Sequence, residues 1–408
     1  MYPTTIPDLG SERTTLGART RPVAVALAIV GLAGLAVGAG LGWRQGDGWA
    51  YFFHAYLVSY AFFLSISLGG LFFVALHHVT RAGWSVTIRR LAELLAATMP
   101  LLAVLFLPIL VPILLGSSTL YVWNNPEVVR ASEVLQHKAG YFGLTFFTVR
   151  AVLYFAVWWL LARFFLARSR QQDESGDPAL TIQMERASPV ALLLFAVTVT
   201  FASFDWLMSL EPTWFSSIFG VYYFAGTTLG ALGTIILAAV ALQACGRLSL
   251  TITTEHYHDL GKLLLGFIIF WGYIAFSQYM LIWYANLPEE TTWYHARQTG
   301  PWAVVSLALL FGQLILPFFG LLSRTVKRRP RLLAFWAVWT LAFHWLDMYW
   351  LVMPGLSPDR VPFGVIDVSL LAGLGCLYLA GLIALAGQHS LIPLGDPRLP
   401  ESLAFENY

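Results

Sequence analysis

The sequence predicts an all-α polytopic membrane protein with ten transmembrane helices, and three observations predict it. Of the 408 residues, 58% are hydrophobic and only 11% are charged, whereas an ordinary soluble domain carries about 25% charged residues. Aromatic residues reach 15% and include 16 Trp, which is typical of rings placed at the two membrane interfaces. Ten apolar runs are each long enough to cross a bilayer. A soluble enzyme, a disordered chain and a nucleic-acid-binding protein are therefore poor interpretations.

The apolar runs set the expected domain organisation. They cover residues 22–42, 51–78, 88–115, 141–166, 189–209, 217–244, 258–287, 301–322, 332–353 and 364–386. We interpret the first run as a retained helix because no obvious cleavage site follows it. A ten-helix membrane domain is expected over 22–386, between a cytoplasmic N-terminal segment at 1–21 and an extended cytoplasmic C-terminal tail at 387–408. The charged stretch 168–178 is expected to be a solvated linker.

The distribution of Lys and Arg predicts the orientation. With ten spans, 18 of the 24 basic residues fall on the side that holds both chain ends, and five fall on the other side. The remaining one, Arg150, lies inside the fourth run. Because cytoplasmic connections carry the excess of basic residues, both termini are predicted to be cytoplasmic.

A short repeat predicts how the spans are grouped. The tetrapeptide FDWL at 204–207 resembles FHWL at 343–346, and each follows a helix that begins at a proline. The runs from the second to the fifth and from the sixth to the ninth would then form two four-helix bundles, with the first and last helices outside them. Parallel repeats of this kind are known in membrane proteins.

Five ionisable residues fall inside the runs, toward the predicted periplasmic half: Arg150, Asp205, His344, Asp347 and Asp367. Such residues are costly in lipid and usually face the bundle interior, where they serve ion or proton paths. His344 and Asp347 share one helix face because they are three residues apart. We predict that the five form the periplasmic half of a proton path. The alternative is a structural ion pair between Arg150 and one of the aspartates.

A second cluster lies at the predicted cytoplasmic ends: His77, His78, Glu93, Asp259 and Lys262. Glu93, Asp259 and Lys262 are the stronger candidates for an inner proton entry. Adjacent histidines point in different directions on a helix and make a poor pair of metal ligands. The alternative for the whole cluster is a set of solvated anchors at the membrane boundary.

The cysteines exclude several cofactors. Cys245 and Cys376 are the two cysteines of the chain, and neither belongs to a CxxC pattern. The chain therefore has no self-contained iron–sulfur site, structural zinc site or attachment site for c-type haem. We expect no metal, no redox cofactor and no catalytic residue on this chain.

Four separated motifs, in order, carry a family resemblance over nearly the whole chain. They are HHVTRAGW at 77–84, FDWLMSL at 204–210, FSQYMLIWYANLPEE at 276–290 and DPRLPESLAFE at 396–406. Together they resemble the NrfD-like ten-helix membrane subunits of bacterial alternative complex III, and among these the ActF type.

The resemblance implies a subunit of a menaquinol-oxidising, electron-acceptor-reducing complex in the bacterial plasma membrane, in a respiratory or photosynthetic chain. The implied partners are a paralogous ten-helix subunit (ActC), an iron–sulfur subunit, c-type cytochrome subunits and small membrane subunits. Iron–sulfur clusters and haem c would lie in those partners, and contact of this chain with menaquinone is possible. The family's membrane carboxylates and histidines are associated with quinol handling or proton transfer, which carries over to the two clusters above.

The chain departs from its quinol-oxidising paralogue at one motif. The resemblance associates that paralogue with a Ser-His-Ala-Gly-Thr segment, whereas this chain has His54-Ala55-Tyr56 at the start of the second run. This departure favours proton conduction or scaffolding over a main quinol-oxidising site. Two alternatives stay open, namely a secondary transporter of a small ion or solute and a purely structural membrane scaffold.

Overall fold

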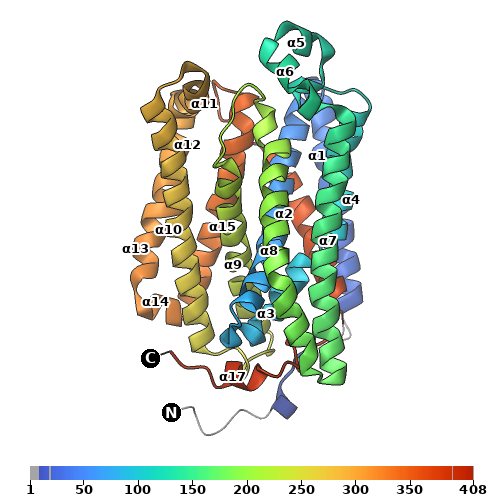
Figure 1. Ribbon diagram of the computed structural model, residues 1–408, viewed down its shortest axis with the longest axis vertical. Helices are drawn as coiled ribbons and strands as arrows, with labels where there is room; N and C mark the ends of the chain where they lie inside the picture. The colour runs from blue at the N-terminus through green and yellow to red at the C-terminus, as the bar shows by residue number, and fades with distance from the viewer. Residues whose placement is uncertain (1–8, 18–19, 388, 408) are drawn as a thin grey trace.

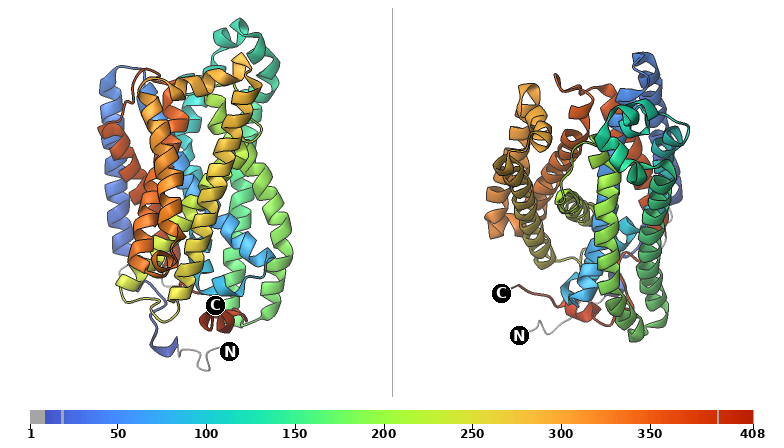
Figure 2. Two further views of the ribbon diagram at one scale, coloured as in Figure 1. Left: turned by 90° about the vertical axis from the view of Figure 1, so that its left-hand side faces the viewer. Right: turned by 45° about the horizontal axis from the view of Figure 1, so that its top comes forward.

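The computed structural model describes residues 9–17, 20–387 and 389–407, and this part of the chain is helical, without a β-strand. The membrane-spanning segments run side by side as one elongated bundle (Figures 1 and 2). Their helices are α1 Thr20–Gln45, α2 Ala50–Val79, α3 Val86–Ala96, α4 Met99–Leu114, α7 Leu144–Ser175, α8 Pro178–Trp206, α9 Phe219–Ala244, α10 Thr254–Ala285, α12 Gly300–Leu309, α13 Leu316–Leu322, α15 Pro330–Val352 and α16 Val365–Ala386. The helices of the connections and the tail are α5 Pro126–Ala131, α6 Glu133–Phe142, α11 Pro288–Gln298, α14 Arg324–Arg328 and α17 Leu399–Leu403. The predicted helical class is confirmed.

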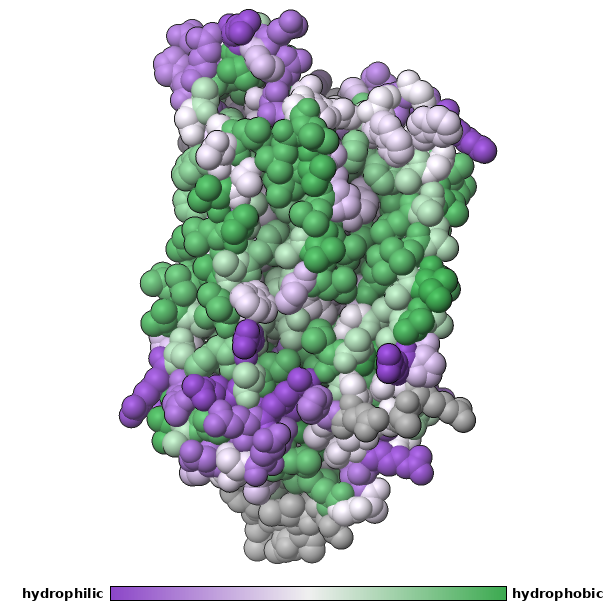
Figure 3. All heavy atoms as spheres, turned by 90° about the vertical axis from the view of Figure 1, so that its right-hand side faces the viewer, coloured by the Kyte–Doolittle hydropathy of each residue, from purple (hydrophilic) through white to green (hydrophobic). Residues whose placement is uncertain are grey.

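The bundle has the surface of a multi-pass membrane protein. Nine helical segments within the described residues are long and apolar enough to cross a membrane. Figure 3 shows an apolar band around the middle of one face, with hydrophilic residues gathered toward both ends. α15 is not among the nine segments, although it runs along the bundle beside them (Figure 1). Its sequence is less apolar because it carries Arg331, His344 and Asp347 among many aromatic residues.

α2 and α9 pack closely against each other at the centre of the bundle. Almost every residue of α2 is buried, as is most of α9. The two backbones approach so closely at Gly69 that a methyl group there would overlap the carbonyl oxygen of Thr227. Small residues permit this kind of approach between membrane helices. α3, α4, α7 and α8 contact α2, while α10 and α15 contact α9.

α1 and α16 form a peripheral pair. Gly31, Gly34 and Gly38 of α1 face α16, where Gly373 lies against the backbone of α1. Figure 2 shows the two helices side by side at the edge of the bundle. Most of α1 is exposed outside this glycine-lined contact.

Two of the membrane segments are interrupted. The run 88–115 was predicted as one helix, but Ala97 and Thr98 separate α3 from α4. Pro100 lies in the first turn of α4, where its missing N–H group costs nothing. In the second segment a π-helical turn, η5 Leu310–Ile315, joins α12 to α13. Such turns are frequently found at functional sites.

The predicted solvated linker at 168–178 is wrong, because α7 continues to Ser175 and only two residues separate it from α8. Gly176 makes the turn with a φ of 63°, and the side chain of Asp177 caps α8 by accepting a hydrogen bond from the backbone N–H of Ala179. The end of α7 stays helical because it is buried against polar partners. Gln172 donates to the hydroxyl of Thr181 at 2.8 Å.

The C-terminal tail folds back across one end of its own chain. It is extended apart from the short helix α17. Leu399 and Leu403 pack with Leu9 and Val86, and the backbone N–H of Leu391 donates to the carbonyl of Thr14. The described residues near both chain ends therefore lie at the same end of the bundle (Figure 1).

Candidate functional site

His344 lies buried in a space that two glycines provide. Its Nε2 atom is 2.7 Å from the hydroxyl of Ser65 on α2. A methyl group on Gly226 would come within 2.8 Å of the imidazole, and Gly230 lines the same side of the ring. The Nδ1 atom of His344 has no hydrogen-bond partner within the described residues. Among the described residues, the imidazole is thus held by a hydrogen bond at Nε2 alone.

Asp347 lies one turn beyond His344 on α15 and is completely buried. One carboxylate oxygen accepts a short hydrogen bond from the hydroxyl of Tyr222, and the other accepts from the indole N–H of Trp271 at 3.2 Å. No Lys, Arg or His within the described residues forms an ion pair with this carboxyl group. A buried carboxyl group without a cation is costly, so its presence favours a functional role.

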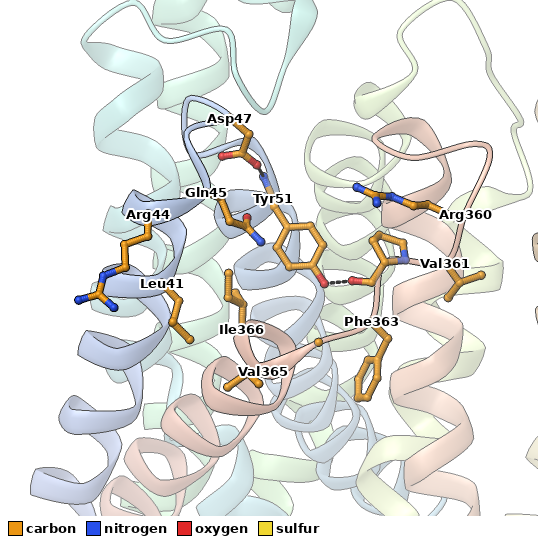
Figure 4. Close-up of a pocket in the computed structure, with 12 residues that line it drawn as sticks. Leu41, Arg44, Gln45, Asp47, Tyr51, Arg360, Val361, Phe363, Val365 and Ile366 are labelled. Carbon is orange, nitrogen blue, oxygen red and sulfur yellow. Dashed lines mark hydrogen bonds between the residues drawn. The ribbon is translucent and has the colours of Figure 1, made fainter.

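Asp367 lies at the start of α16, next to an open hollow. Its carboxylate accepts from the hydroxyl of Tyr51 and from the backbone N–H of Gly364, the latter at 2.8 Å. Tyr51 also lines the hollow, whose volume is about 740 Å³. Figure 4 shows the tyrosine inside it, with the phenol on the Pro362 carbonyl and the side chain of Arg360 nearby. Through this hollow, the medium outside the protein comes close to the buried carboxyl group of Asp367.

Arg150 and Asp205 form a bidentate ion pair between α7 and α8. Nε and Nη2 of the arginine donate to the two carboxylate oxygens at 2.7 and 2.8 Å. Tyr154 donates to the same carboxylate at 2.8 Å, and the rings of Tyr141 and Phe146 lie 4.0 and 4.2 Å from the guanidinium carbon. This is the geometry expected of a structural ion pair between Arg150 and one of the aspartates, which was the alternative to a proton path.

Glu93 lies at the other end of the bundle, in a charged network in which Arg89, Arg90 and Asp396 are buried and Asp173 is partly exposed. Arg90 Nε is 2.9 Å from its carboxylate and Arg89 Nε is 3.7 Å away. Arg90 also pairs with Asp173 at 2.8 Å, and Arg89 pairs with Asp396 of the tail. The tail and the end of α7 therefore enclose this carboxylate with charged partners.

His77 and His78 point to different surroundings, as their adjacent positions predict. The Nδ1 atom of His77 lies 2.7 Å from the Phe73 carbonyl, and its ring stacks on Phe73. The ring of His78 stacks on Phe165 of α7 with centroids 5.5 Å apart. Both imidazoles are buried.

Asp259 and Lys262 lie apart from that network. They pair with each other on α10, and the ammonium group of Lys262 donates to the side chain of Asn407 at 2.8 Å. In the described part of the chain no hydrogen bond or ion pair joins either residue to Glu93. The structure thus divides the predicted inner cluster into separate groups.

Tyr222 and Trp271 were not predicted as site residues, although they hold Asp347. Tyr222 lies four residues before Gly226 and eight before Gly230 on α9, so all three share the helix face that meets α15. This four-residue spacing is the signal in the sequence that could have identified Tyr222 as a site residue. No pattern in the sequence near Trp271 identifies it as a partner of Asp347, because this contact joins two different helices, α10 and α15.

A group of hydroxyls surrounds the break between α3 and α4. Ser67 Oγ lies 2.6 Å from the hydroxyl of Thr98 and 2.8 Å from that of Tyr378. Tyr60 donates to the Leu102 carbonyl one turn into α4. These hydroxyl groups lie on α2, at the break itself and on α16.

The described residues contain no group of three or more His, Cys, Asp or Glu side chains that could hold a metal ion. No protein-family model matches the chain, and no curated protein matches it. The functional interpretation therefore depends on the residues and the geometry described above.

Proposed function

We propose that this chain is an integral membrane subunit of a menaquinol:electron-acceptor oxidoreductase of the alternative complex III type, in the position of its ActF subunit. It contributes a proton-transfer path through the bundle and binds no redox cofactor of its own. One observation carries the proposal: Asp347 is fully buried without a cation, held by Tyr222 and Trp271 one turn from His344. Carboxyl and imidazole groups in this setting are the usual elements of membrane proton relays.

The proposal places the chain in a bacterial plasma membrane with ten crossings and cytoplasmic ends. Nine apolar segments and α15 make ten, an even number that agrees with both described ends lying at one end of the bundle. The basic helix α14 and Arg331 at the start of α15 lie in a connection assigned to the cytoplasm. α2 contacts α3, α4, α7 and α8, while α9 contacts α10 and α15, which supports two four-helix groups that meet where α2 packs on α9.

The outer half of the proposed path contains Ser65, His344 and Asp347, and ends at Asp367 beside the hollow lined by Tyr51. Each carboxyl group has a phenol as its hydrogen-bond donor, and phenol hydroxyls can pass protons along with water. Arg150 and Asp205 stay predicted members of this half. Their bidentate pairing supports a role in holding α7 against α8.

The inner half contains His77, His78, Glu93, Asp259 and Lys262, of which Glu93 has the best position. It is buried in the second half of α3, five residues before Thr98 at the helix break. The proposed partners are the ActC-like paralogue, an iron–sulfur subunit, c-type cytochrome subunits and small membrane subunits, which supply the electron carriers.

Two measurements test the proposal. First, a tagged chain is purified from its native membrane, and c-type haem absorbance and iron are measured in the purified material. Co-purification of both supports membership of the complex, whereas a chain that purifies without either contradicts it.

Second, the complex with Asp347→Asn is compared with the complex carrying Asp359→Asn, a control in the exposed connection after α15. Asp347→Asn is expected to lower quinol-driven proton release by at least about tenfold without loss of any subunit. The control is expected to behave as wild type. Unchanged proton release and turnover in Asp347→Asn would contradict the proton-path role.

The interrupted helices favour a second candidate, a secondary transporter of a small ion or solute. Transporters of this kind bind substrates where membrane helices are discontinuous, and Ser67, Thr98 and Tyr378 gather at such a break. A purely structural scaffold is the third candidate, favoured by the Arg150–Asp205 pair. Purification of a chain free of haem and iron favours the transporter, and unaltered turnover after joint neutralisation of the buried charges favours the scaffold.

A further inference from the structure

The hollow beside Asp367 lies where two membrane-spanning segments end. Arg44 and Gln45 are the last residues of α1, Val365 is the first residue of α16, and all three line the hollow. Trp43, next to Arg44, is exposed, as expected of an aromatic ring at the membrane interface. The volume of about 740 Å³ gives room for a small organic group at this boundary.

Two arginines flank the hollow. Five Lys or Arg residues fall on this side of the predicted topology, and Arg44 and Arg360 are two of them. Figure 4 shows them on opposite sides of Tyr51, with Arg360 directed toward the phenol and Arg44 directed outward from α1. Both side chains are exposed, and neither guanidinium forms an ion pair within the described residues. Both are therefore available to an anion at the membrane surface.

The acid that lines the hollow is held by backbone groups. Asp47 accepts hydrogen bonds from the backbone N–H groups of Trp49 at 3.1 Å and Tyr51 at 2.9 Å. Its carboxylate therefore lies at the start of α2, where the helix dipole stabilises a negative charge. Asp367 lies behind the phenol of Tyr51, which donates to it. Two guanidinium groups beside one capped carboxylate leave an excess of positive charge in the lining.

The remaining lining is apolar and leads toward the membrane core. Phe363 and Val365 are 59% and 68% exposed, and Leu41 of α1 lies beside the same space. Val37 lies four residues before Leu41, and Val368 lies three residues after Val365; both are exposed. Residues at these spacings share a helix face. Apolar tracks on α1 and α16 therefore run from the hollow toward the middle of the membrane.

We propose that the hollow binds the phosphodiester headgroup of an anionic phospholipid, with its acyl chains along the apolar tracks of α1 and α16. A guanidinium group matches phosphate because it can donate two parallel hydrogen bonds at once. A headgroup with one net negative charge balances the excess positive charge of the lining. Its acyl chains cover Phe363 and Val365. The site goes beyond the proposed function and does not depend on it.

The lining distinguishes this lipid from other ligands that carry phosphate. Inorganic phosphate has no apolar part, so it gains nothing from Phe363 and Val365. Phosphatidylcholine has the same phosphate and acyl chains, but its choline group brings a positive charge beside two arginines. An anionic lipid such as phosphatidylglycerol meets both the charge and the apolar surface of the hollow.

The test uses the full chain in phosphatidylcholine nanodiscs that contain equal minor fractions of phosphatidylglycerol and phosphatidylethanolamine. Native mass spectrometry measures which lipid stays bound to the chain after its release from the nanodisc. Arg44→Gln, Arg360→Gln and the double variant remove the cationic groups. Arg130→Gln is the matched control, because Arg130 is an exposed basic residue of α5 on the same side and does not line the hollow.

We expect the wild type and Arg130→Gln to retain phosphatidylglycerol in preference to the other two lipids. The double variant should lose at least about tenfold of that retention, and each single variant should lose part of it. Sodium chloride at about 1 M should also lower retention in the wild type, because salt screens ion pairs at an exposed site. Size-exclusion chromatography checks that each variant is folded, and the single variants stay informative if the double variant aggregates.

Three outcomes would overturn the proposal. The first is equal retention of the three lipids, or a preference for phosphatidylethanolamine, in the wild type. The second is equal retention of phosphatidylglycerol by Arg130→Gln and by the variants that lack Arg44 or Arg360. The third is release of the bound lipid by millimolar inorganic phosphate, which would identify a site for free phosphate instead.

Discussion

The imidazole of His344 and the hydroxyl of Ser65 lie 2.7 Å apart and join α15 to α2 through the buried centre of the protein. This contact is one of few direct polar links between the two halves of the predicted repeat. The hydroxyl also donates to the carbonyl of Phe62 in its own helix. The hydroxyl of Ser65 is therefore held in one orientation, and it holds the imidazole of His344 in one orientation in turn.

Removal of that hydroxyl should destabilise the bundle. In Ser65→Ala the imidazole nitrogen loses its described partner in a buried site, which costs about 1–3 kcal/mol. Ser59 on the same helix is an internal control, since its buried hydroxyl has no hydrogen-bond partner within the described residues. We expect a lower melting temperature for Ser65→Ala and an unchanged or slightly higher one for Ser59→Ala, measured in detergent. Equal melting temperatures would contradict this role of the contact.

The close approach of α2 and α9 should be sensitive to a single methyl group. In Gly69→Ala the new methyl meets backbone atoms of Thr227, which cannot move aside as a side chain could, so the helices must separate. A loss of about 2–4 kcal/mol is expected. Gly266→Ala on α10 adds a methyl into open space and should change stability by less than about 1 kcal/mol. The yield of monodisperse protein and its melting temperature measure both effects.

Neutralising one member of the Arg150–Asp205 pair should be worse than neutralising both. Arg150→Met leaves a buried carboxylate without its cation, and a loss of about 3–5 kcal/mol is expected. The double variant Arg150→Met, Asp205→Leu removes both charges and should recover much of that stability. Chemical denaturation of the wild type, Arg150→Met, Asp205→Leu and the double variant in mixed micelles gives the coupling energy. Additive effects of the two substitutions would mean that the pair does not stabilise the fold.

Arg297 should be irreplaceable by lysine. Its guanidinium donates to the carbonyls of Trp293 and Leu351 and to the carboxylate of Glu211, each at 3.0 Å. Burial lowers the pKa of Arg297, while Glu211 beside it acts in the opposite direction. Lysine has one nitrogen in place of three, so Arg297→Lys leaves buried acceptors unpaired at a cost of about 2–4 kcal/mol.

The matched control is Arg360→Lys, an exposed position in another connection, where little change is expected. Thermal unfolding followed by tryptophan fluorescence compares the two variants. Equal stability of both would show that the donor geometry of Arg297 is unimportant.

The C-terminal tail should protect the charged network at the end of α3. Asp396 pairs with Arg89, and the hydroxyl of Ser402 lies 3.1 Å from that of Thr87. In Asp396→Asn the buried arginine loses a charged partner, so the tail should detach more often. Hydrogen exchange in residues 84–96 should rise several-fold, while Glu406→Gln, an exposed tail position, should leave it unchanged. Unaltered exchange in both variants would show that this pair does not hold the tail.

The apolar helices were predicted well because a helix that crosses lipid must be apolar along its whole length, and this property can be read directly from a sequence. The predicted runs 22–42 and 51–78 differ by only a few residues from α1 and α2. The interruption at Ala97–Thr98 was missed because apolar residues flank it on both sides, Leu94–Ala96 before it and Leu101–Ala103 after it. The helical end of α7 was missed because polar residues in it are buried by contacts with Arg90, 79 residues away from Ser169, and with Thr181 on the next helix.

The candidate site was predictable in part. The spacing of His344 and Asp347 correctly placed both on one helix face, and the expected alternative of an Arg150–Asp ion pair has its geometry in the Asp205 contact. The partners of Asp347 could not be predicted, since Tyr222 and Trp271 are 125 and 76 residues away in the chain. Such contacts depend on how helices pack, which a single sequence does not specify.

The glycine-lined contact of α1 with α16 has a consequence for biosynthesis. Among the described membrane helices, α1 leaves the ribosome before all others, and α16, which receives it, leaves after them. Until α16 is made, the glycine-lined face of α1 therefore lacks its partner helix and must contact lipid or a chaperone at the translocon. The contact between α1 and α16 is then the last of the described helix contacts to form. A chain released before α16 is made would expose the glycine-lined face of α1, a surface that favours association with other membrane helices.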